Sequence, residues 1–175
     1  MELRLLLIRH GEAKRDGRAD LELTSKGRKQ ALDLAHALDA AGDLEASAAL
    51  LSSPLPRARQ TAEAIARRSD LEILTEQDLC EMGDTPSVGE SEEFDAFLVR
   101  VDRALSRLAK DYAEETVIVV THAGFIVGSV LTLFNVPREG SRARLDPVNA
   151  SVTEWRLESS VWALASYNSL PGAAF

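Results

Sequence analysis

The sequence predicts an α/β fold, a three-layer α/β/α sandwich in which helices cover both faces of a mostly parallel sheet. Short apolar runs alternate along the chain with longer segments in which apolar residues recur at helical spacing. The clearest apolar runs, 5–8 and 117–120, each lead into a histidine, His10 and His122, that stands beside a glycine turn. Because open parallel sheets bind ligands beyond the carboxyl ends of their strands, we expect both histidines at a ligand site.

Length and composition indicate one soluble globular domain that spans residues 1–175. The net charge of −8 argues against nucleic acid and against an anionic membrane surface as partners. Cys80 is the only cysteine, so the chain has no internal disulfide and no cysteine metal cluster, which fits a reducing, cytoplasmic location. The N-terminal apolar run is short and contains Arg4, unlike a signal peptide, and no run is long enough to span a bilayer. The composition indicates no particular oligomeric state.

The first predicted strand covers residues 3–8. A charged stretch with a glycine follows at 13–22 and is expected to be a loop. Loops beyond strand ends carry specificity, so Lys14, Arg15 or Arg18 could reach a substrate from this loop.

Thr24 is the expected N-cap of the first helix, and Gly42 marks its expected end. The helix has an apolar stripe at intervals of three and four residues, formed by Ala31, Leu34, Ala35 and Leu38. His36 falls on the opposite, polar face and is therefore predicted at the surface.

The second strand is predicted at 46–52, and Ser53 is the expected N-cap of a helix that has Pro54 in its first turn. Arg57 and Arg59 are two positions apart and so lie on different faces of that helix. One of them can therefore point at a site above the sheet. A helix N-terminus attracts anions, and a guanidinium group binds phosphate through two donors, so phosphate is the natural ligand.

A third strand is predicted at 71–74, followed by an acidic stretch with glycines and a proline at 76–90 that should form a loop. Glu81 lies in this loop beside Cys80, which we interpret as a small passive residue.

Ser91 is the expected N-cap of a long helix. Glu92 and Glu93 would then lie in its first turn, where carboxylates interact favourably with the helix dipole.

The last elements predicted are the strand at 117–121 and an apolar helix at 125–134, followed by segments 152–157 and 161–166, which form either an antiparallel hairpin or two separate late strands. The tail from Leu170 is expected to be loose.

Five motifs occur in order along the chain, and a sixth short segment follows them. They are Leu7-Ile8-Arg9-His10-Gly11-Glu12, Leu23-Thr24-x-x-Gly27-x-x-Gln30-Ala31, Ser52-Ser53-Pro54-Leu55-x-Arg57-Ala58-x-Gln60-Thr61-Ala62, Gly89-Glu90-Ser91, Thr121-His122-Ala123-Gly124 and Asn149-Ala150-Ser151-Val152. Together they span nearly the whole chain, and the sequence resembles the histidine phosphatase superfamily in its phosphoglycerate-mutase-like branch. Arg-His-Gly alone would be a weak signal, whereas the ordered set is specific.

The resemblance implies that His10 is the catalytic nucleophile that becomes phosphorylated, while Arg9, Arg57 and His122 hold the phosphoryl oxygens. Phosphoryl transfer needs positioning and charge stabilisation, which these side chains supply without a metal or cofactor. To attack, His10 must be neutral, and neighbouring guanidinium groups should lower its pKa. Its second ring nitrogen should donate to a fixed acceptor such as a backbone carbonyl, which sets the tautomer.

Glu81 falls where the family often keeps its proton donor, with Glu12 and Glu90 as alternatives. The segment 79–84 lacks the aromatic-rich motif that many phosphatases of the family carry after this glutamate. In the implied reaction the acid protonates the departing alkoxide, and water then cleaves phospho-His10 with the same carboxylate as base.

The function implied is a metal-independent phosphatase that acts on a small phosphorylated metabolite or a phosphoprotein. The segment 9–13 and its short following loop also resemble bacterial phosphohistidine phosphatases, so a phosphohistidine protein substrate is one alternative. A phosphoglycerate mutase is another, although it would need covering segments and little chain lies between Glu81 and Ser91. An inactive phosphate-binding module is the third.

Overall fold

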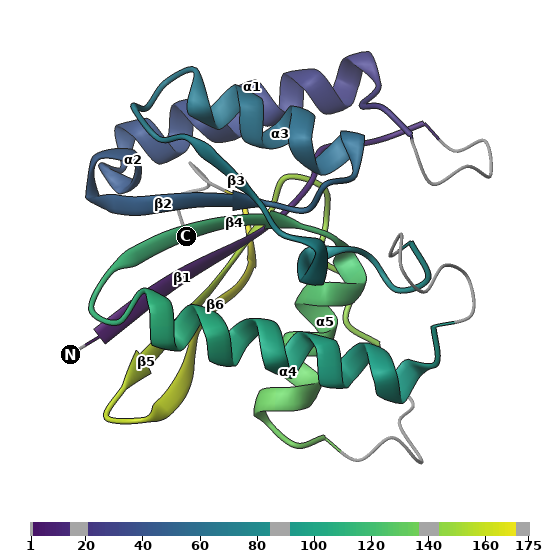
Figure 1. Ribbon diagram of the computed structural model, residues 1–175. Helices are drawn as coiled ribbons and strands as arrows, with labels where there is room; N and C mark the ends of the chain where they lie inside the picture. The colour runs from purple at the N-terminus through teal and green to yellow at the C-terminus, as the bar shows by residue number, and fades with distance from the viewer. Residues whose placement is uncertain (1, 15–20, 85–91, 137–143, 171–175) are drawn as a thin grey trace.

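Six strands form one sheet in the order β3-β2-β4-β1-β5-β6 in the computed structural model, which describes residues 2–14, 21–84, 92–136 and 144–170 (Figure 1). The strands are β1 (Glu2–Arg9), β2 (Ser47–Ser52), β3 (Ile73–Thr75), β4 (Thr116–Thr121), β5 (Val152–Glu158) and β6 (Val161–Ser169). The first four run parallel, whereas β5 and β6 pair antiparallel at one edge. The predicted fold class is therefore confirmed.

Helices cover both faces of this sheet. They are α1 (Ser25–Ala40), α2 (Asp43–Ala46), α3 (Pro56–Ala66), the 3₁₀ helix η1 (Gln77–Leu79), α4 (Phe94–Asp111) and α5 (Ala123–Leu133). Figure 1 shows α1 and α3 on one face and α4 and α5 on the other. None of these helices combines the length and apolar character that crossing a membrane requires.

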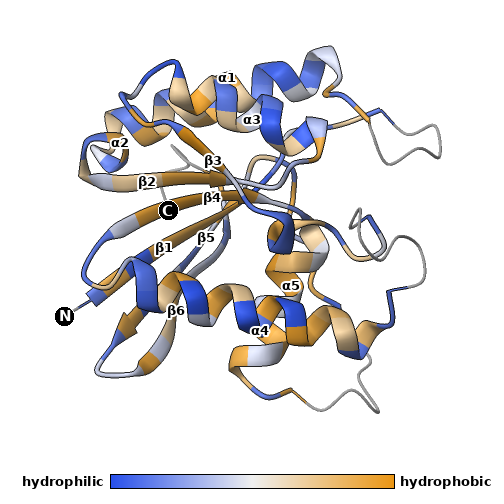
Figure 2. Cartoon of the chain, viewed as in Figure 1, coloured by the Kyte–Doolittle hydropathy of each residue, from blue (hydrophilic) through white to orange (hydrophobic). Residues whose placement is uncertain are grey.

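Alternate residues of β1 point into two separate apolar clusters. Leu6 and Ile8 pack with α1 and α3, while Leu5 and Leu7 pack with α4 and α5. All four side chains are buried, and Figure 2 shows the apolar colouring of the central strands between the two helix layers. Burial on both sides explains why this strand is a continuous apolar run rather than an alternating one.

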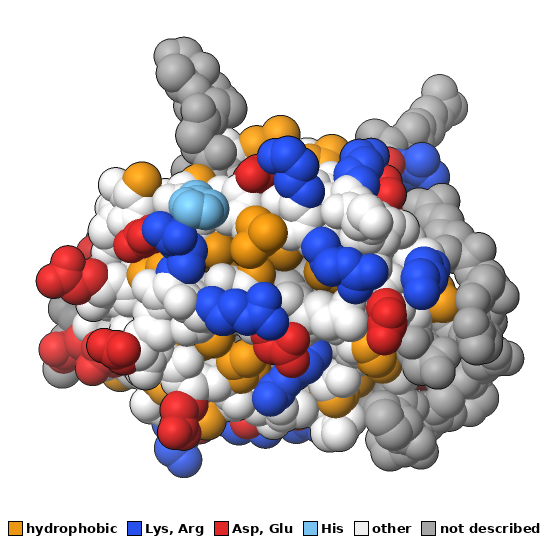
Figure 3. Space-filling view, turned by 90° about the horizontal axis from the view of Figure 1, so that it is seen from above, with side chains coloured by type: hydrophobic (Ala, Val, Ile, Leu, Met, Phe, Trp, Pro, Cys, Tyr) orange, Lys and Arg blue, Asp and Glu red, His pale blue; other side chains and the backbone are white. Residues whose placement is uncertain are grey.

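The outer face of α1 and α3 carries charges of both signs (Figure 3). Exposed ion pairs form there, among them Lys29 with Asp33 and Arg68 with Asp39. His36 is also exposed on α1, as its position on the polar face predicted. This face is a solvated surface.

The predicted start of α3 was wrong by two residues. Pro56, not Pro54, occupies the first helical position, and Leu55 rather than Ser53 is the N-cap. The hydroxyl of Ser53 lies instead 2.8 Å from Nε2 of His122. A tertiary partner has therefore taken the side chain that local capping rules assigned to the helix end.

The predicted start of α4 was also wrong. The helix begins at Phe94 with Glu93 as its N-cap, so Glu92 lies before the first turn. Glu92 is buried and forms an ion pair with Arg100 at 2.6 Å. A buried pair of opposite charges outweighs the modest benefit of a carboxylate near a helix N-terminus. Ser91 lies outside the described residues.

Other boundaries either match the expectation or differ from it by two or three residues. The hydroxyl of Thr24 accepts a hydrogen bond from the Gly27 amide at 3.0 Å, so Thr24 caps α1 as predicted. Helix α5 begins directly after His122, two residues earlier than predicted, and β6 extends three residues further than predicted. Helix α2 was not predicted. Arg15 and Arg18 lie outside the described residues, as does the tail 171–175.

Candidate active site

The site forms where three parallel strands end side by side. Strands β1, β4 and β2 finish in register, with Arg9 beside Thr121 and Ser52 beside Val120. The next residues of the three strands are therefore His10, His122 and Ser53. The His10 amide still donates to the carbonyl of Thr121 at 3.0 Å, which fixes the start of the loop that carries the nucleophile candidate.

The two ring nitrogens of His10 have different partners. Nδ1 lies 2.7 Å from the carbonyl oxygen of Gly11, and Nε2 lies 3.3 Å from Nε of Arg57. A carbonyl can only accept and a guanidinium can only donate, so the hydrogen belongs on Nδ1 and the lone pair on Nε2. The expected carbonyl acceptor is thus present, and Nε2 is the atom able to attack.

Burial and nearby positive charge keep His10 neutral. His10 is only 8% exposed. Its pKa is lowered to about 3, and this burial is the largest cause. The charges of Arg57 and Arg9 lower the pKa further. Sequence reasoning expected the guanidinium effect, but the structure assigns the larger share to desolvation.

Arg57 is buried beside His10, while Arg59 points to the other side of α3, where it donates to the hydroxyl of Thr75 at 2.9 Å. The two arginines thus lie on different faces of α3, as predicted, and Arg57 is the one that lines the pocket described below. Nη2 of Arg57 also forms an ion pair with Oδ2 of Asp84 at 2.7 Å. Asp84 had no signal in the sequence beyond its place in an acidic stretch.

His122 is fully buried, and the centre of its ring lies 5.1 Å from that of His10, edge to face. Nε2 of His122 is held by Ser53 at 2.8 Å. Among the described residues, Nδ1 of His122 is buried without a hydrogen-bond partner. Burial, followed by the ring of His10 and the neighbouring arginines, lowers the pKa of His122 well below its usual value.

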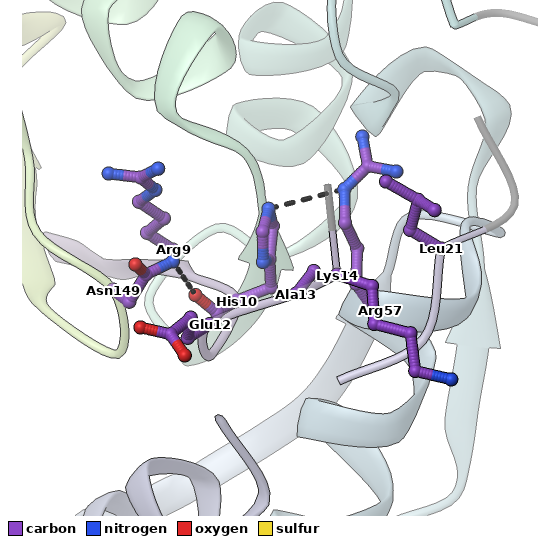
Figure 4. Close-up of a pocket in the computed structure, with 8 residues that line it drawn as sticks. All are labelled: Arg9, His10, Glu12, Ala13, Lys14, Leu21, Arg57 and Asn149. Carbon is purple, nitrogen blue, oxygen red and sulfur yellow. Dashed lines mark hydrogen bonds between the residues drawn. The ribbon is translucent and has the colours of Figure 1, made fainter. Parts of the chain in front are cut away.

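A pocket of about 170 Å³ opens beside His10. It is lined by Arg9, His10, Glu12, Ala13, Lys14, Leu21, Arg57 and Asn149. Figure 4 shows the ring of His10 between the side chains of Arg9 and Arg57. The guanidinium of Arg9 donates to the carbonyl of Pro147. Three of the lining residues are cationic, so the pocket favours an anion despite the negative charge of the whole chain.

Glu81 is not among the described residues that line the pocket, but its carboxylate is bound at the start of α5, the helix that follows His122. Its Oε2 accepts from the Gly124 amide at 3.0 Å and its Oε1 from the Met82 amide at 2.9 Å. A Cβ atom at position 124 would overlap Oε1, so the first turn of α5 admits this carboxylate only beside a glycine. The carboxylate of Glu81 is therefore bound by Gly124, two residues after His122.

Of the two alternative acids, Glu12 and Glu90, the structure describes only Glu12. Glu12 lines the pocket, but its carboxylate accepts from the hydroxyl of Thr24 at 2.9 Å and from Lys26 at 2.8 Å. Glu90 lies outside the described residues.

Several motif residues to which sequence reasoning gave no role hold the His10 loop. The Gly11 amide donates to the hydroxyl of Thr61 at 3.1 Å, and that hydroxyl donates to the carbonyl of Arg57 at 2.8 Å. The side-chain amide of Asn149 donates through Nδ2 to the carbonyl of His10 at 3.0 Å (Figure 4). These side chains tie the nucleophile loop to α3 and to the segment before β5.

Gly11 and Gly27 are required because the loop passes directly over the first turn of α1. A Cβ atom at Gly11 would overlap the carbonyl of Gly27, and one at Gly27 would overlap the carbonyl of Glu12. The amide of Glu12 also donates to the side chain of Gln30 at 2.8 Å. The spacing of this motif thus reflects close backbone packing.

Within residues 2–14, 21–84, 92–136 and 144–170, no group of three or more histidine, cysteine, aspartate or glutamate side chains is placed to hold a metal ion. Cys80 is buried, and burial raises the pKa of its thiol, which fits a passive role.

Comparison with known proteins gives consistent matches. The family model of the histidine phosphatase superfamily (branch 1) matches residues 5–84 and 83–170. Phosphoglycerate mutase-like protein 4 of Arabidopsis thaliana is 29% identical over 196 residues, covering 91% of this chain and 82% of the relative.

The metal-independent phosphoserine phosphatase of the same plant is 29% identical over 199 residues, covering 94% of this chain and 80% of the relative. Among solved structures, a phosphoserine phosphatase of Entamoeba histolytica in complex with 3-phosphoglyceric acid superposes with a TM-score of 0.74. It is 25% identical, and the match covers 95% of this chain and 97% of that one.

Proposed function

Because the chain belongs to the histidine phosphatase superfamily, we propose that it hydrolyses phosphomonoesters through a phosphohistidine intermediate on His10. The observation that carries this proposal is the hydrogen bonding of the ring, which places a lone pair on Nε2 beside Arg57. In the first step Nε2 attacks phosphorus, a P–N bond forms and the ester P–O bond breaks. In the second step water attacks phosphorus, the P–N bond breaks and inorganic phosphate leaves.

The charge on the transferred phosphoryl group is stabilised by Arg9, Arg57 and His122. Phosphoryl transfer is accelerated mainly by positioning and by charge stabilisation on the equatorial oxygens. When the Ser53 hydroxyl donates to Nε2 of His122, Nδ1 carries the hydrogen and can donate to a phosphoryl oxygen. The buried Nδ1 would thereby gain the partner that it lacks among the described residues.

Glu81 is the acid that protonates the departing alkoxide and the base that then accepts a proton from the attacking water. Two backbone amides hold its carboxylate at the start of α5, next to His122. The carboxylate of the rival Glu12 is bound by the Thr24 hydroxyl and by the charged ammonium group of Lys26, whereas both amides that bind Glu81 are neutral. What supports the role is the place of this carboxylate at the first turn of α5, directly after His122, since a general acid must lie near the reacting groups.

The substrate that fits best is a small phosphorylated metabolite. The pocket volume of about 170 Å³ lies below the roughly 300–1,000 Å³ typical of sites for larger ligands. One relative is named a phosphoserine phosphatase, and the solved structure contains 3-phosphoglyceric acid, a small carboxylated phosphoester. Phosphorylated hydroxy or amino acids are therefore the first compounds to screen.

Because one relative is named phosphoglycerate mutase-like, mutase activity is the alternative to test. A mutase of this kind should require added 2,3-bisphosphoglycerate, whereas a phosphatase should release inorganic phosphate without it.

We also infer that residues 1–175 form a single domain and that the protein works in the cytoplasm. The lone Cys80 supports the cytoplasmic location. Cell fractionation and limited proteolysis test these two inferences.

The direct test is to trap the intermediate. Phosphohistidine is labile in acid and stable in alkali, so a rapid quench in base followed by peptide mapping should place about 80 Da, one HPO₃ unit, on His10. His10→Ala should lose both the adduct and turnover. His122→Ala should still label slowly, because it loses charge stabilisation but keeps the attacking atom. His36→Ala, a change at an exposed histidine on α1, is the matched control and should behave like the parent.

Two results would overturn the proposal. An adduct on His122 would exchange the roles of the two histidines. Turnover in His10→Ala, with no adduct in the parent, would mean that water attacks the substrate directly.

A further inference from the structure

A buried ion pair that the reaction described above does not use lies beneath the segment that carries Glu81. Arg100 and Glu92 are only 5% and 6% exposed. Their contact is bidentate, with Nε to Oε1 at 2.7 Å and Nη2 to Oε2 at 2.6 Å. Burying two charges is costly, and an apolar pair of similar volume is often equally stable, so stability alone does not account for this pair.

The remaining donors of Arg100 bind the main chain of that segment. The guanidinium donates to the carbonyl oxygens of Asp78, Cys80 and Glu81 at 2.9, 2.9 and 3.4 Å. On the other side of the pair, Oε2 of Glu92 accepts from the Gly83 amide at 3.1 Å. The pair therefore holds the backbone on both sides of Glu81.

The same segment is fixed at its opposite side by residues next to His122. The hydroxyl of Thr121 donates to the carbonyl of Leu79 at 2.7 Å, and the Gly124 amide binds the carboxylate of Glu81. Glu81 thus bridges α4 and the start of α5. A shift of its backbone would move the carboxylate relative to His122 and to the neighbouring His10.

We propose that Arg100, held in place by Glu92, is a positioning residue that sets the backbone of Glu81 so that its carboxylate can protonate the leaving oxygen. This inference rests on the proposed phosphatase reaction and on Glu81 as its acid. Arg100 acts only through Glu81, so its loss should weaken proton donation and leave the attack by His10 largely intact.

The experiment compares two substrates that differ in their need for a proton. An alkyl phosphate such as glycerol 2-phosphate needs protonation of its leaving group, whereas p-nitrophenyl phosphate needs little. Glu81→Gln should lower kcat/KM for the alkyl phosphate by roughly 10²–10⁴-fold and affect p-nitrophenyl phosphate less. Arg100→Lys, which keeps the charge but loses the guanidinium fork, should lower kcat/KM for the alkyl phosphate about tenfold or more and change the other substrate less than about threefold.

A double variant, Arg100→Met with Glu92→Met, removes the pair without leaving an unpaired buried charge and guards against a folding defect in the single variant. It should show the same selective loss. In a Glu81→Gln background, neither change should alter the ratio of the two substrates further, because the group that Arg100 positions is already gone. Arg103→Lys is the matched control, since the exposed Arg103 lies three residues further along α4 and binds the side chain of Asp78, at 2.7 Å, rather than the main chain around Glu81.

The outcomes separate the two levels of inference. The positioning role alone would be overturned by the following combination. Glu81→Gln shows the expected selective loss on the alkyl phosphate, but the Arg100→Lys and double variants lose activity equally on both substrates or lose none. Absence of turnover in the parent, or a Glu81→Gln variant without the selective loss, would overturn the proposed acid and the positioning role with it.

Discussion

Asp84 occupies part of the donor surface through which Arg57 is proposed to hold a phosphoryl group. Nε and Nη2 lie on the same edge of a guanidinium group. In Arg57, Nε faces Nε2 of His10 at 3.3 Å and Nη2 faces the carboxylate of Asp84 at 2.7 Å. A phosphoryl group on its way to His10 needs the same edge and must compete with this carboxylate, so Asp84→Asn should strengthen phosphate binding.

The size of the effect follows from the geometry of the pair. A hydrogen bond between charged groups contributes about 1.5–3 kcal/mol to stability when well formed. The side chain of Asp84 is 27% exposed, so solvent screening places this pair at or below the lower end of that range. About 1–1.5 kcal/mol corresponds to roughly 5–10-fold tighter binding of inorganic phosphate or vanadate.

The assay is competitive inhibition of p-nitrophenyl phosphate turnover by phosphate and by vanadate. Asp39→Asn is the matched control, because Asp39 pairs with Arg68 on the surface at 2.7 Å and its loss changes the net charge by the same amount. The control should leave both inhibition constants within about twofold of the parent, as expected for a screened distant charge. Unchanged or weaker inhibition in Asp84→Asn would refute the competition and would instead mean that Asp84 holds Arg57 in its binding position.

Three further predictions follow from the site. EDTA should leave turnover unchanged because Arg9 and Arg57 supply the positive charge, and activity lost on chelation but restored by a divalent ion would contradict this. Since the folded-state pKa of His10 is about 3 and its ordinary value 6.5, the unfolded state takes up the proton first. The free energy of unfolding should then fall as pH drops from about 6.5 toward 3, by up to about 5 kcal/mol. Urea titrations should show a smaller fall in His10→Gln. Gly124→Ala should push the carboxylate of Glu81 aside and slow alkyl phosphate hydrolysis at least about tenfold, with less effect on p-nitrophenyl phosphate; a uniform loss would argue against Glu81 as the acid.

The parts of the site that sequence predicts are those set by local pattern. An apolar run that ends at a turn places His10 and His122 at strand ends, and the parallel sheet brings those ends together. Helical geometry likewise separates Arg57 from Arg59, since positions two apart cannot share a face. Each of these inferences needs only neighbouring residues and a general rule about the fold.

The parts that sequence missed depend on partners distant along the chain. Asp84 meets Arg57 across 27 positions, and nothing near either residue indicates the pairing. Glu92 has the local features of a helix-start carboxylate, but Arg100 two turns into the helix draws it under the loop of Glu81. Ser53 fails as an N-cap for the same reason, because His122 offers its hydroxyl a buried partner. The local preference of a residue for a helix end is outweighed where its side chain is needed as the hydrogen-bond partner of a buried polar atom.

Burial within the fold and the charges of Arg57 and Arg9 both lower the pKa of His10, but they contribute unequally. Burial is the larger cause, so the imidazole is kept neutral chiefly by its buried position in the fold. The loop that carries His10 is packed against α1 through Gly11 and Gly27 and is held by Thr61, none of which contributes charge. Consequently the guanidinium groups are needed mainly for the phosphoryl oxygens, and a histidine on an exposed loop, with a pKa nearer its ordinary value, would lose part of its attacking population to protonation at mildly acidic pH. The glycines of the motif are therefore as necessary to the nucleophile as its cationic neighbours.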